Sequence, residues 1–129
     1  MLDDSPAFSG FSTNNLEQAK VFYEEILGLK VALSPEPMAM VTLSLATGGK
    51  VLIYHKEDHS AATYTVLNFP VVDIDAVVEN LLSKGVVFEH YQGMTDEKGV
   101  ARGRSVNRGP DIAWFKDPAG NILSVLQED

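Results

Sequence analysis

The sequence predicts an α+β fold built from two copies of a βαβββ module. Three observations support this prediction. The expected elements follow the order strand, helix, three strands, and this order occurs twice. A glycine, Gly28 or Gly85, follows each expected helix. A glycine-containing turn, at Gly48-Gly49 and at Gly120-Asn121, precedes the last strand of each half.

The two modules are expected over residues 5–57 and residues 64–128. No Pro- or Ser-rich linker separates them, so we expect a single domain over residues 1–129 with one shared core. A chain of 129 residues, 45% of them hydrophobic, is long enough to bury such a core and too short for two ordinary domains.

The first helix is expected over residues 16–27, where apolar side chains recur at helical spacing. Asn14 followed by Glu17 forms a variant of the capping box at its start, and Gly28 ends it. The second helix is expected over residues 74–84, with Asp73 as its N-cap and Gly85 as its terminator.

Short runs rich in β-branched and aromatic residues predict eight strands, over residues 7–12, 30–33, 40–45, 50–55, 65–71, 86–91, 112–116 and 122–127. The last two strands flank Lys116-Asp117-Pro118-Ala119-Gly120-Asn121. In this run Pro fixes φ, Gly permits a positive φ, and Asp and Asn hydrogen-bond their own backbone, so we expect a tight turn.

Composition excludes several functional classes. The chain has no cysteine, which removes disulfides, thiolate metal sites and cysteine nucleophiles. A net charge of -8 argues against a nucleic-acid surface, because phosphate binding needs clustered cations. We expect no membrane partner and a cytoplasmic protein, since no apolar run is long enough for a bilayer and the N-terminus, Met1-Leu2-Asp3-Asp4, is acidic.

Two motifs together resemble the vicinal oxygen chelate superfamily, which includes glyoxalase I, extradiol dioxygenases, and fosfomycin- and bleomycin-resistance proteins. They are Phe22-Tyr23-Glu24-Glu25-Ile26-Leu27-Gly28-Leu29 and Asp117-Pro118-Ala119-Gly120-Asn121. The resemblance covers nearly the whole chain. It implies paired βαβββ modules whose mixed sheet curls around a cleft, and two chains assembled as a homodimer.

The resemblance also implies where a divalent ion would bind in metal-dependent relatives, on the first and last strand of each module, through His, Glu or Gln. Counting from the two motifs and the internal repeat maps these positions to Phe8, Ile53, Leu67 and Ser124. None is a usual metal ligand. A shift of one residue recovers at most Tyr54 and Asn68. We therefore expect no metal and no other cofactor.

Because side chains alternate along a strand, the mapped positions are expected to share a face with further residues. These are Gly10, Ser12, Val51, His55, Phe69, Val71, Ile122 and Leu126. The expected ligand-binding residues are Phe8, Ile53, His55, Leu67, Phe69 and Ser124. A mostly apolar wall with a few polar groups suits a small organic molecule. The alternative is that these side chains fill a closed core.

Two other features are candidates for a role. His55 and His59 flank Lys56-Glu57-Asp58, which is typical of a polar loop and not of an aligned ligand pair. The segment 92–111 contains Arg102, Arg104 and Arg108 and is expected to be a long loop. It either closes over the cleft and presents an arginine to an anionic ligand group, or forms a solvated hairpin or an arm on the other subunit.

Two functional hypotheses follow. The first is a metal-independent protein, similar to bleomycin-resistance proteins, that binds a small organic ligand in an apolar cleft. The second is an enzyme, either a divalent-metal-dependent lyase, isomerase or dioxygenase, or a metal-free catalyst that uses His55 or a loop arginine. A third possibility is a dimeric interaction module. No catalytic residue is identified.

Overall fold

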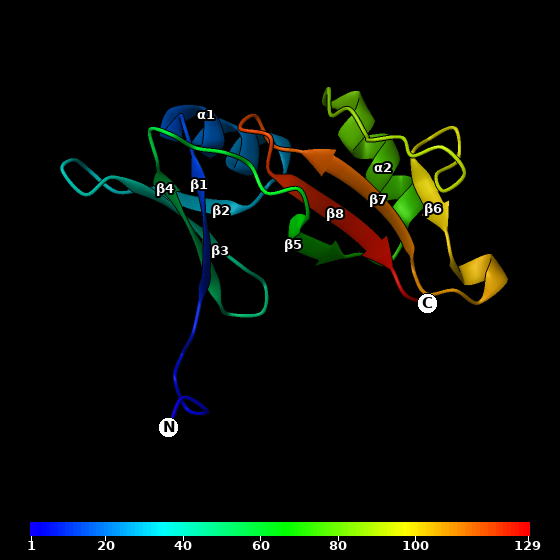
Figure 1. Cartoon of the computed structure of the whole chain (residues 1–129), viewed down its shortest axis with the longest axis horizontal. Helices are drawn as coiled ribbons and strands as arrows, with labels where there is room; N and C mark the ends of the chain where they lie inside the picture. Colours follow the sequence, from blue (N-terminus) through cyan, green and yellow to red (C-terminus); the bar gives the residue numbers. More distant parts are fainter. The chain divides into compact units, whose positions relative to one another are not determined.

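The computed structural model describes residues 1–129, which form two compact units, Met1–Ser60 and Ala61–Asp129. Each unit is a four-stranded mixed sheet with one long helical segment (Figure 1). The predicted modules, residues 5–57 and 64–128, lie one in each unit. Their union into a single domain stays a prediction.

The first unit contains β1 (Ser9–Thr13), α1 (Leu16–Val21), η1 (Phe22–Ile26), β2 (Lys30–Leu33), β3 (Met40–Ser44) and β4 (Lys50–His55). Its strand order is β1-β4-β3-β2, with β1 parallel to β4 and the other neighbours antiparallel.

The second unit contains β5 (Thr65–Pro70), α2 (Ile74–Ser83), β6 (Val100–Arg102), η2 (Arg104–Val106), β7 (Asp111–Lys116) and β8 (Ile122–Gln127). Its order, β5-β8-β7-β6, repeats the pattern of the first unit, with β5 parallel to β8. The predicted α+β fold of two βαβββ modules is therefore confirmed.

The helix ends follow from their capping residues. Asp73 caps α2 as predicted, accepting a hydrogen bond from the Ala76 N–H at 3.2 Å. The cap of α1 is Asn15 and not Asn14, because the Asn15 carboxamide is the group that accepts from the Gln18 N–H, at 3.0 Å. Beyond Val21 the helix continues as the wider π-type turn η1. Gly28, at φ 75°, follows it in the left-handed region that favours glycine.

The predicted strand at 86–91 is wrong. Only one bridge forms there, between Phe88 and Phe115, and the edge strand of the second sheet is β6 instead. This strand lies inside the segment 92–111 that was expected to be a loop. Its position depends on Asp96, whose Oδ1 accepts from the backbone N–H groups of Lys98 and Val100, each at 2.9 Å. Hydrophobic periodicity carries no signal for such a bond.

Each sheet packs a helix on one face only. In the first unit α1 packs over β2, β3 and β4, and the buried core includes Phe11, Tyr23 and Ile53. In the second unit α2 packs over β7 and β8, with Val78 and Phe115 fully or nearly fully buried. No helix is long and apolar enough to cross a membrane.

The predicted tight turn between β7 and β8 is confirmed, and Asp117 organises it. This buried carboxylate accepts three hydrogen bonds at 2.9 Å, from the backbone N–H groups of Ala119 and Asn121 and from the Asn121 side-chain amide. Gly120 adopts φ 86°, which a Cβ would strain. The turn sets the pairing of Lys116 with Ile122.

We expect Asp117→Ala to lower the free energy of unfolding by about 2–3 kcal/mol, because it leaves three donors without their charged acceptor. Urea unfolding measures this change. The double variant with Asn121→Ala should cost at least about 1 kcal/mol less than the sum of the single changes, since the two side chains are bonded. Glu128→Ala, at the exposed C-terminus, is the control. Strict additivity would contradict this account of the turn.

Candidate functional site

The sheet of the second unit has a face that α2 does not cover. Along β7 and β8 the buried residues Ala113, Phe115, Leu123 and Val125 lie on the helix side. Because side chains alternate, the residues between them point to the other side. We call this side the helix-distal face. Its members on these two strands are Ile112, Trp114, Lys116, Ile122, Ser124 and Leu126.

A row of four side chains crosses this face. Asn68 on β5 is paired with Ser124 on β8, which is paired in turn with Trp114 on β7. The Ser124 hydroxyl donates to the Asn68 carboxamide oxygen at 2.5 Å. The Tyr91 ring meets Trp114 edge-on, with the ring centroids 5.6 Å apart. The row therefore joins a neutral polar pair to an aromatic pair.

The surroundings of the row are apolar and carry little net charge. Ile112, Ile122 and Leu126 are half-buried. Lys116 forms an ion pair with Glu89 at 3.4 Å, so these two charges compensate each other. A surface of this kind contacts an uncharged organic molecule at little desolvation cost.

The helix-distal face of the first unit is more polar. Ser12 on β1 is paired with Tyr54 on β4, and Tyr54 with Met40 on β3. The Ser12 hydroxyl and His59 Nδ1 are 2.6 Å apart, so a hydrogen bond joins them. His59 thus contacts a strand residue, whereas His55 is exposed at the end of β4.

The prediction that the four mapped positions and the residues alternating with them share one face of the sheet is wrong in both units. In the first unit Ile53 is paired with Phe11 and is fully buried on the helix side, opposite to Gly10 and Ser12. Phe8 lies just before β1 and is 54% exposed, with the Lys50 ammonium 4.7 Å from its ring centroid.

In the second unit Leu67 and Phe69 are paired with Leu123 and Val125 and so lie on the helix side, away from Ser124. The pairing of β5 with β8 is regular from Leu67 to Pro70, so the position counted back from Val72-Asp73 is one residue away from the partner of Ser124. Asn68, the residue one further on, takes the place opposite Ser124.

Three residues of the row, Asn68, Trp114 and Tyr91, were not predicted as ligand contacts. The turn at Asp117 and Asn121 contains the signal for Trp114, because a tight hairpin that pairs Lys116 with Ile122 necessarily pairs Trp114 with Ser124. The contact of Tyr91 with Trp114 depends on a chain segment without regular structure, for which the sequence has no comparable signal.

The residues of the row do not make a ligand set for a divalent ion. A serine hydroxyl and a neutral carboxamide are weak donors compared with carboxylate or imidazole groups. No three His, Cys, Asp or Glu side chains gather in a way that would hold a metal ion.

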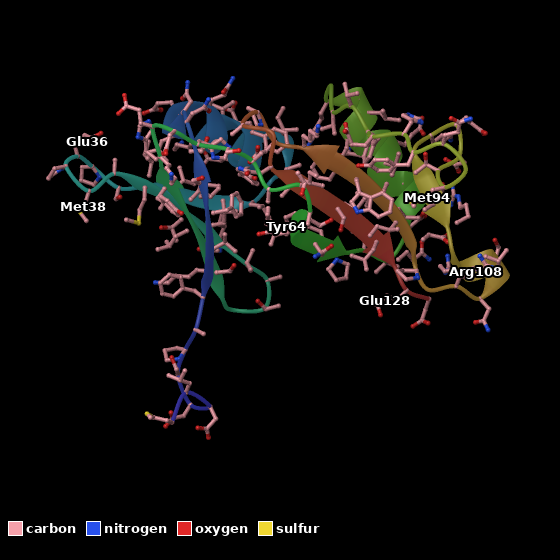
Figure 2. All side chains as sticks on the ribbon, viewed as in Figure 1. Glu36, Met38, Tyr64, Met94, Arg108 and Glu128 are labelled. Carbon is pink, nitrogen blue, oxygen red and sulfur yellow. The ribbon has the colours of Figure 1, made fainter.

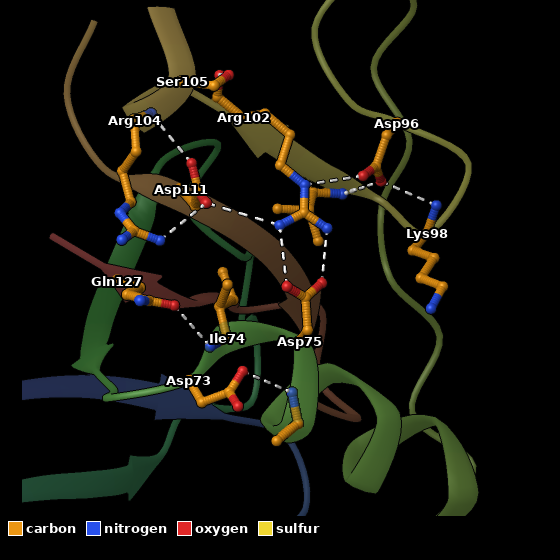
Figure 3. A network of polar contacts seen from close by, with 12 residues as sticks. Asp73, Ile74, Asp75, Asp96, Lys98, Arg102, Arg104, Ser105, Asp111 and Gln127 are labelled. Atoms are coloured by element: carbon orange, nitrogen blue, oxygen red, sulfur yellow. Dashed lines mark hydrogen bonds and ion pairs between the residues drawn. The ribbon is translucent and has the colours of Figure 1, made fainter. Parts of the chain in front are cut away.

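Two of the three arginines of segment 92–111, Arg102 and Arg104, form ion pairs with carboxylates (Figure 3). Arg102 forms a bidentate pair with Asp75 of α2, at 2.6 and 3.2 Å, and also contacts Asp96 at 3.0 Å and Asp111 at 3.6 Å. Arg104 contacts Asp111 at 3.5 Å. The Arg102 guanidinium therefore clamps β6 to the start of α2 and is already occupied by protein groups.

This clamp shifts the ionisation of its carboxylates. The hydrogen bonds from Arg102 hold the pKa of Asp75 below its ordinary value. Burial by itself raises the pKa of Asp96, but the N–H of Val100 and the Arg102 guanidinium together bring it below the ordinary value. Both carboxyl groups thus favour the folded state most when they are ionised.

Comparison with protein families gives one match, over residues 8–125, to the model described as Glyoxalase/Bleomycin resistance protein/Dioxygenase superfamily. No curated protein matches the chain.

Solved structures of the same fold include a superfamily member from Sphaerobacter thermophilus, with 20% identity, coverage of 99% of this chain and 100% of that one, and a TM-score of 0.72. TnmS3, an antibiotic binding protein from Streptomyces sp. CB03234, has 19% identity, coverage of 95% and 93%, and a TM-score of 0.71. A lactoylglutathione lyase from Agrobacterium tumefaciens has 18% identity, coverage of 97% and 95%, and a TM-score of 0.69. These likenesses show the fold.

We expect Arg102→Ala to lower the free energy of unfolding by about 1–2 kcal/mol at pH 7, a value reduced from that of a buried pair because Arg102 is 35% exposed. The folded-state pKa values of Asp75 and Asp96 are depressed, so their contribution is present above about pH 4 and is lost as the pH falls further. The difference in the free energy of unfolding between the wild type and Arg102→Ala should therefore become smaller as the pH falls below about 4.

Urea unfolding between pH 3 and pH 7 measures this difference. Arg108→Ala is the matched control, because Arg108 is exposed and forms no ion pair. A difference that stays constant, or grows, on acidification would contradict the clamp.

Proposed function

Because the chain belongs to the glyoxalase/bleomycin resistance protein/dioxygenase superfamily, we propose that it binds a small organic ligand without a metal ion. The observation that supports this most strongly is the row Asn68–Ser124–Trp114–Tyr91 on the helix-distal face. It combines an aromatic pair with neutral hydrogen-bonding groups.

Each part of the row has a role in this proposal. Trp114 and Tyr91 offer apolar area, which favours burial of a ring by about 25 cal/mol per Å². Asn68, which is exposed, orients the ligand, since its amide N–H groups hydrogen-bond a hydroxyl or carbonyl. Ser124 is fully buried and holds the Asn68 carboxamide in place through the hydrogen bond from its hydroxyl. TnmS3 shows that this fold occurs in an antibiotic binding protein.

The ligand-binding residues expected from the sequence have different positions in this proposal. Ser124 lies buried beneath the helix-distal face as the partner of Asn68, and Phe8, exposed beside β1, remains available to a ligand. Ile53, Leu67 and Phe69 support the sheet from the helix side instead. His55 borders a different hollow, described below.

We expect 2-naphthol, a neutral aromatic probe with one hydroxyl, to bind with a Kd of about 0.1 mM, as its number of non-hydrogen atoms suggests. Trp114 is the only tryptophan, so its fluorescence reports the binding directly. By calorimetry, Trp114→Ala should weaken binding about tenfold through the loss of ring contact, whereas Trp114→Phe should retain most of it.

The control is Val87→Ala, which removes an exposed apolar side chain of the same unit. The affinity should be unchanged when EDTA is present. A strict requirement for an added divalent ion, or a stoichiometric ion in protein purified without a histidine tag, would favour a metal-dependent lyase, isomerase or dioxygenase over this proposal.

The homodimer is part of the same proposal. It predicts a particle of twice 14.1 kDa by light scattering at micromolar concentration. A monomeric mass at that concentration would remove the dimer from the proposal and leave the binding experiment unaffected.

A further inference from the structure

The first unit contains a hollow that shares no residue with the row on the second unit. It encloses about 770 Å³, within the range of small-molecule sites. Its lining comes from the start of α1, the loop between β2 and β3, and the end of β4. Neither the strand alternation nor the family motifs indicated it.

The loop that forms one wall is closed by its own hydrogen bonds. The Ser34 hydroxyl donates to the Met38 carbonyl and accepts from the Met40 N–H, each at 3.0 Å, and the Ser34 N–H donates to the Met40 carbonyl at 3.0 Å. Figure 2 shows Glu36 and Met38 at the tip of this loop. The wall is therefore formed before any ligand arrives, which lowers the entropic cost of binding.

The charges of the hollow have one sign. Glu17 of α1 and Glu36 of the loop line it, and no lysine or arginine does. Neither glutamate forms an ion pair, whereas Glu24, the next acidic residue after Glu17, is bound to Lys20 at 2.7 Å. The lining therefore contains two carboxylates and no lysine or arginine, although Lys20 of α1 partly offsets the charge of Glu17.

The rest of the lining suits the body of an organic cation. Leu16, Leu33 and Met40 are half-buried and apolar, and Met38 adds a polarisable thioether. Tyr54 also lines the hollow, and its side chain is 45% exposed. Carboxylates with a tyrosine ring are the groups that attract an ammonium ion and its alkyl substituents.

We propose that this hollow is a second binding site, specific for a small organic cation with an apolar body, such as a substituted or quaternary amine. Glu17 and Glu36 supply the attraction, Tyr54 contacts the cationic head, and the apolar side chains contact the body. The site is independent of the function proposed above, since it shares no residue with the row around Trp114.

Phenyltrimethylammonium is the test probe, and benzenesulfonate, an aromatic anion of similar size, is the comparison. Backbone amide shifts in a ¹H–¹⁵N NMR titration of the full chain locate the binding and give the affinity. We expect the cation to shift the amide signals of Tyr54 and of the non-proline residues between 33 and 40, with a Kd of about 1 mM, and the anion to leave them unchanged.

Glu17→Gln and Glu36→Gln should each weaken cation binding about threefold, and the double variant about tenfold. Tyr54→Leu should weaken it about fivefold. Glu57→Gln, an exposed glutamate outside the lining, should leave it unchanged, as should Trp114→Ala.

Equal binding of the cation and the anion, shifts located away from the loop, or an effect of Glu57→Gln equal to that of Glu17→Gln would overturn the proposal. None of these results would affect the interpretation of the 2-naphthol experiment on the second unit. Conversely, loss of naphthol binding in Trp114→Ala does not bear on the cation site.

Discussion

The carboxylate of Asp117 sets the register on which the second unit depends. By holding two backbone N–H groups and the Asn121 amide, it forces Lys116 opposite Ile122 and therefore Trp114 opposite Ser124. A slip of one residue between β7 and β8 would exchange the two faces, placing Trp114 against α2 and Phe115 on the side that α2 leaves uncovered. One buried turn thus decides both which residues form the core and which are offered to a ligand.

The sequence was sufficient to predict those elements whose structure depends on neighbouring residues in the chain. Both helices, the hairpin at Asp117 and most strands follow from apolar spacing and from residues that cap or turn the chain. It was insufficient where position depends on side-chain bonds or on register. β6 is placed by Asp96, which binds the backbone of Val100, and the face of β5 is set by its register with β8. Hydrophobic periodicity indicates neither, so counting along β5 selected Leu67, whereas Asn68 lies opposite Ser124.

This single displacement changes what the candidate site offers chemically. With Leu67 beside Ser124 the face would hold one polar group and would be suited to little beyond packing. With Asn68 there, a hydroxyl is hydrogen-bonded to a carboxamide next to an indole ring. The face then offers polar groups that orient a ligand and apolar area that contacts it. The same pair supplies no charge. A divalent ion gains its binding energy from anionic or imidazole donors, so the groups that suit a neutral aromatic molecule are poor ones for chelation.

The chain has a net charge of -8, and many of its cationic side chains are paired with carboxylates. Arg102 forms ion pairs with Asp75, Asp96 and Asp111, so its positive charge is neutralised by protein carboxylates. Several lysines are likewise paired, for example Lys98 with Glu79 at 3.5 Å. Two acidic groups without an ion pair, Glu17 and Glu36, line the same hollow in the first unit. An anionic ligand is disfavoured there by the local charge and by the net charge of the protein, whereas a cation is attracted by both.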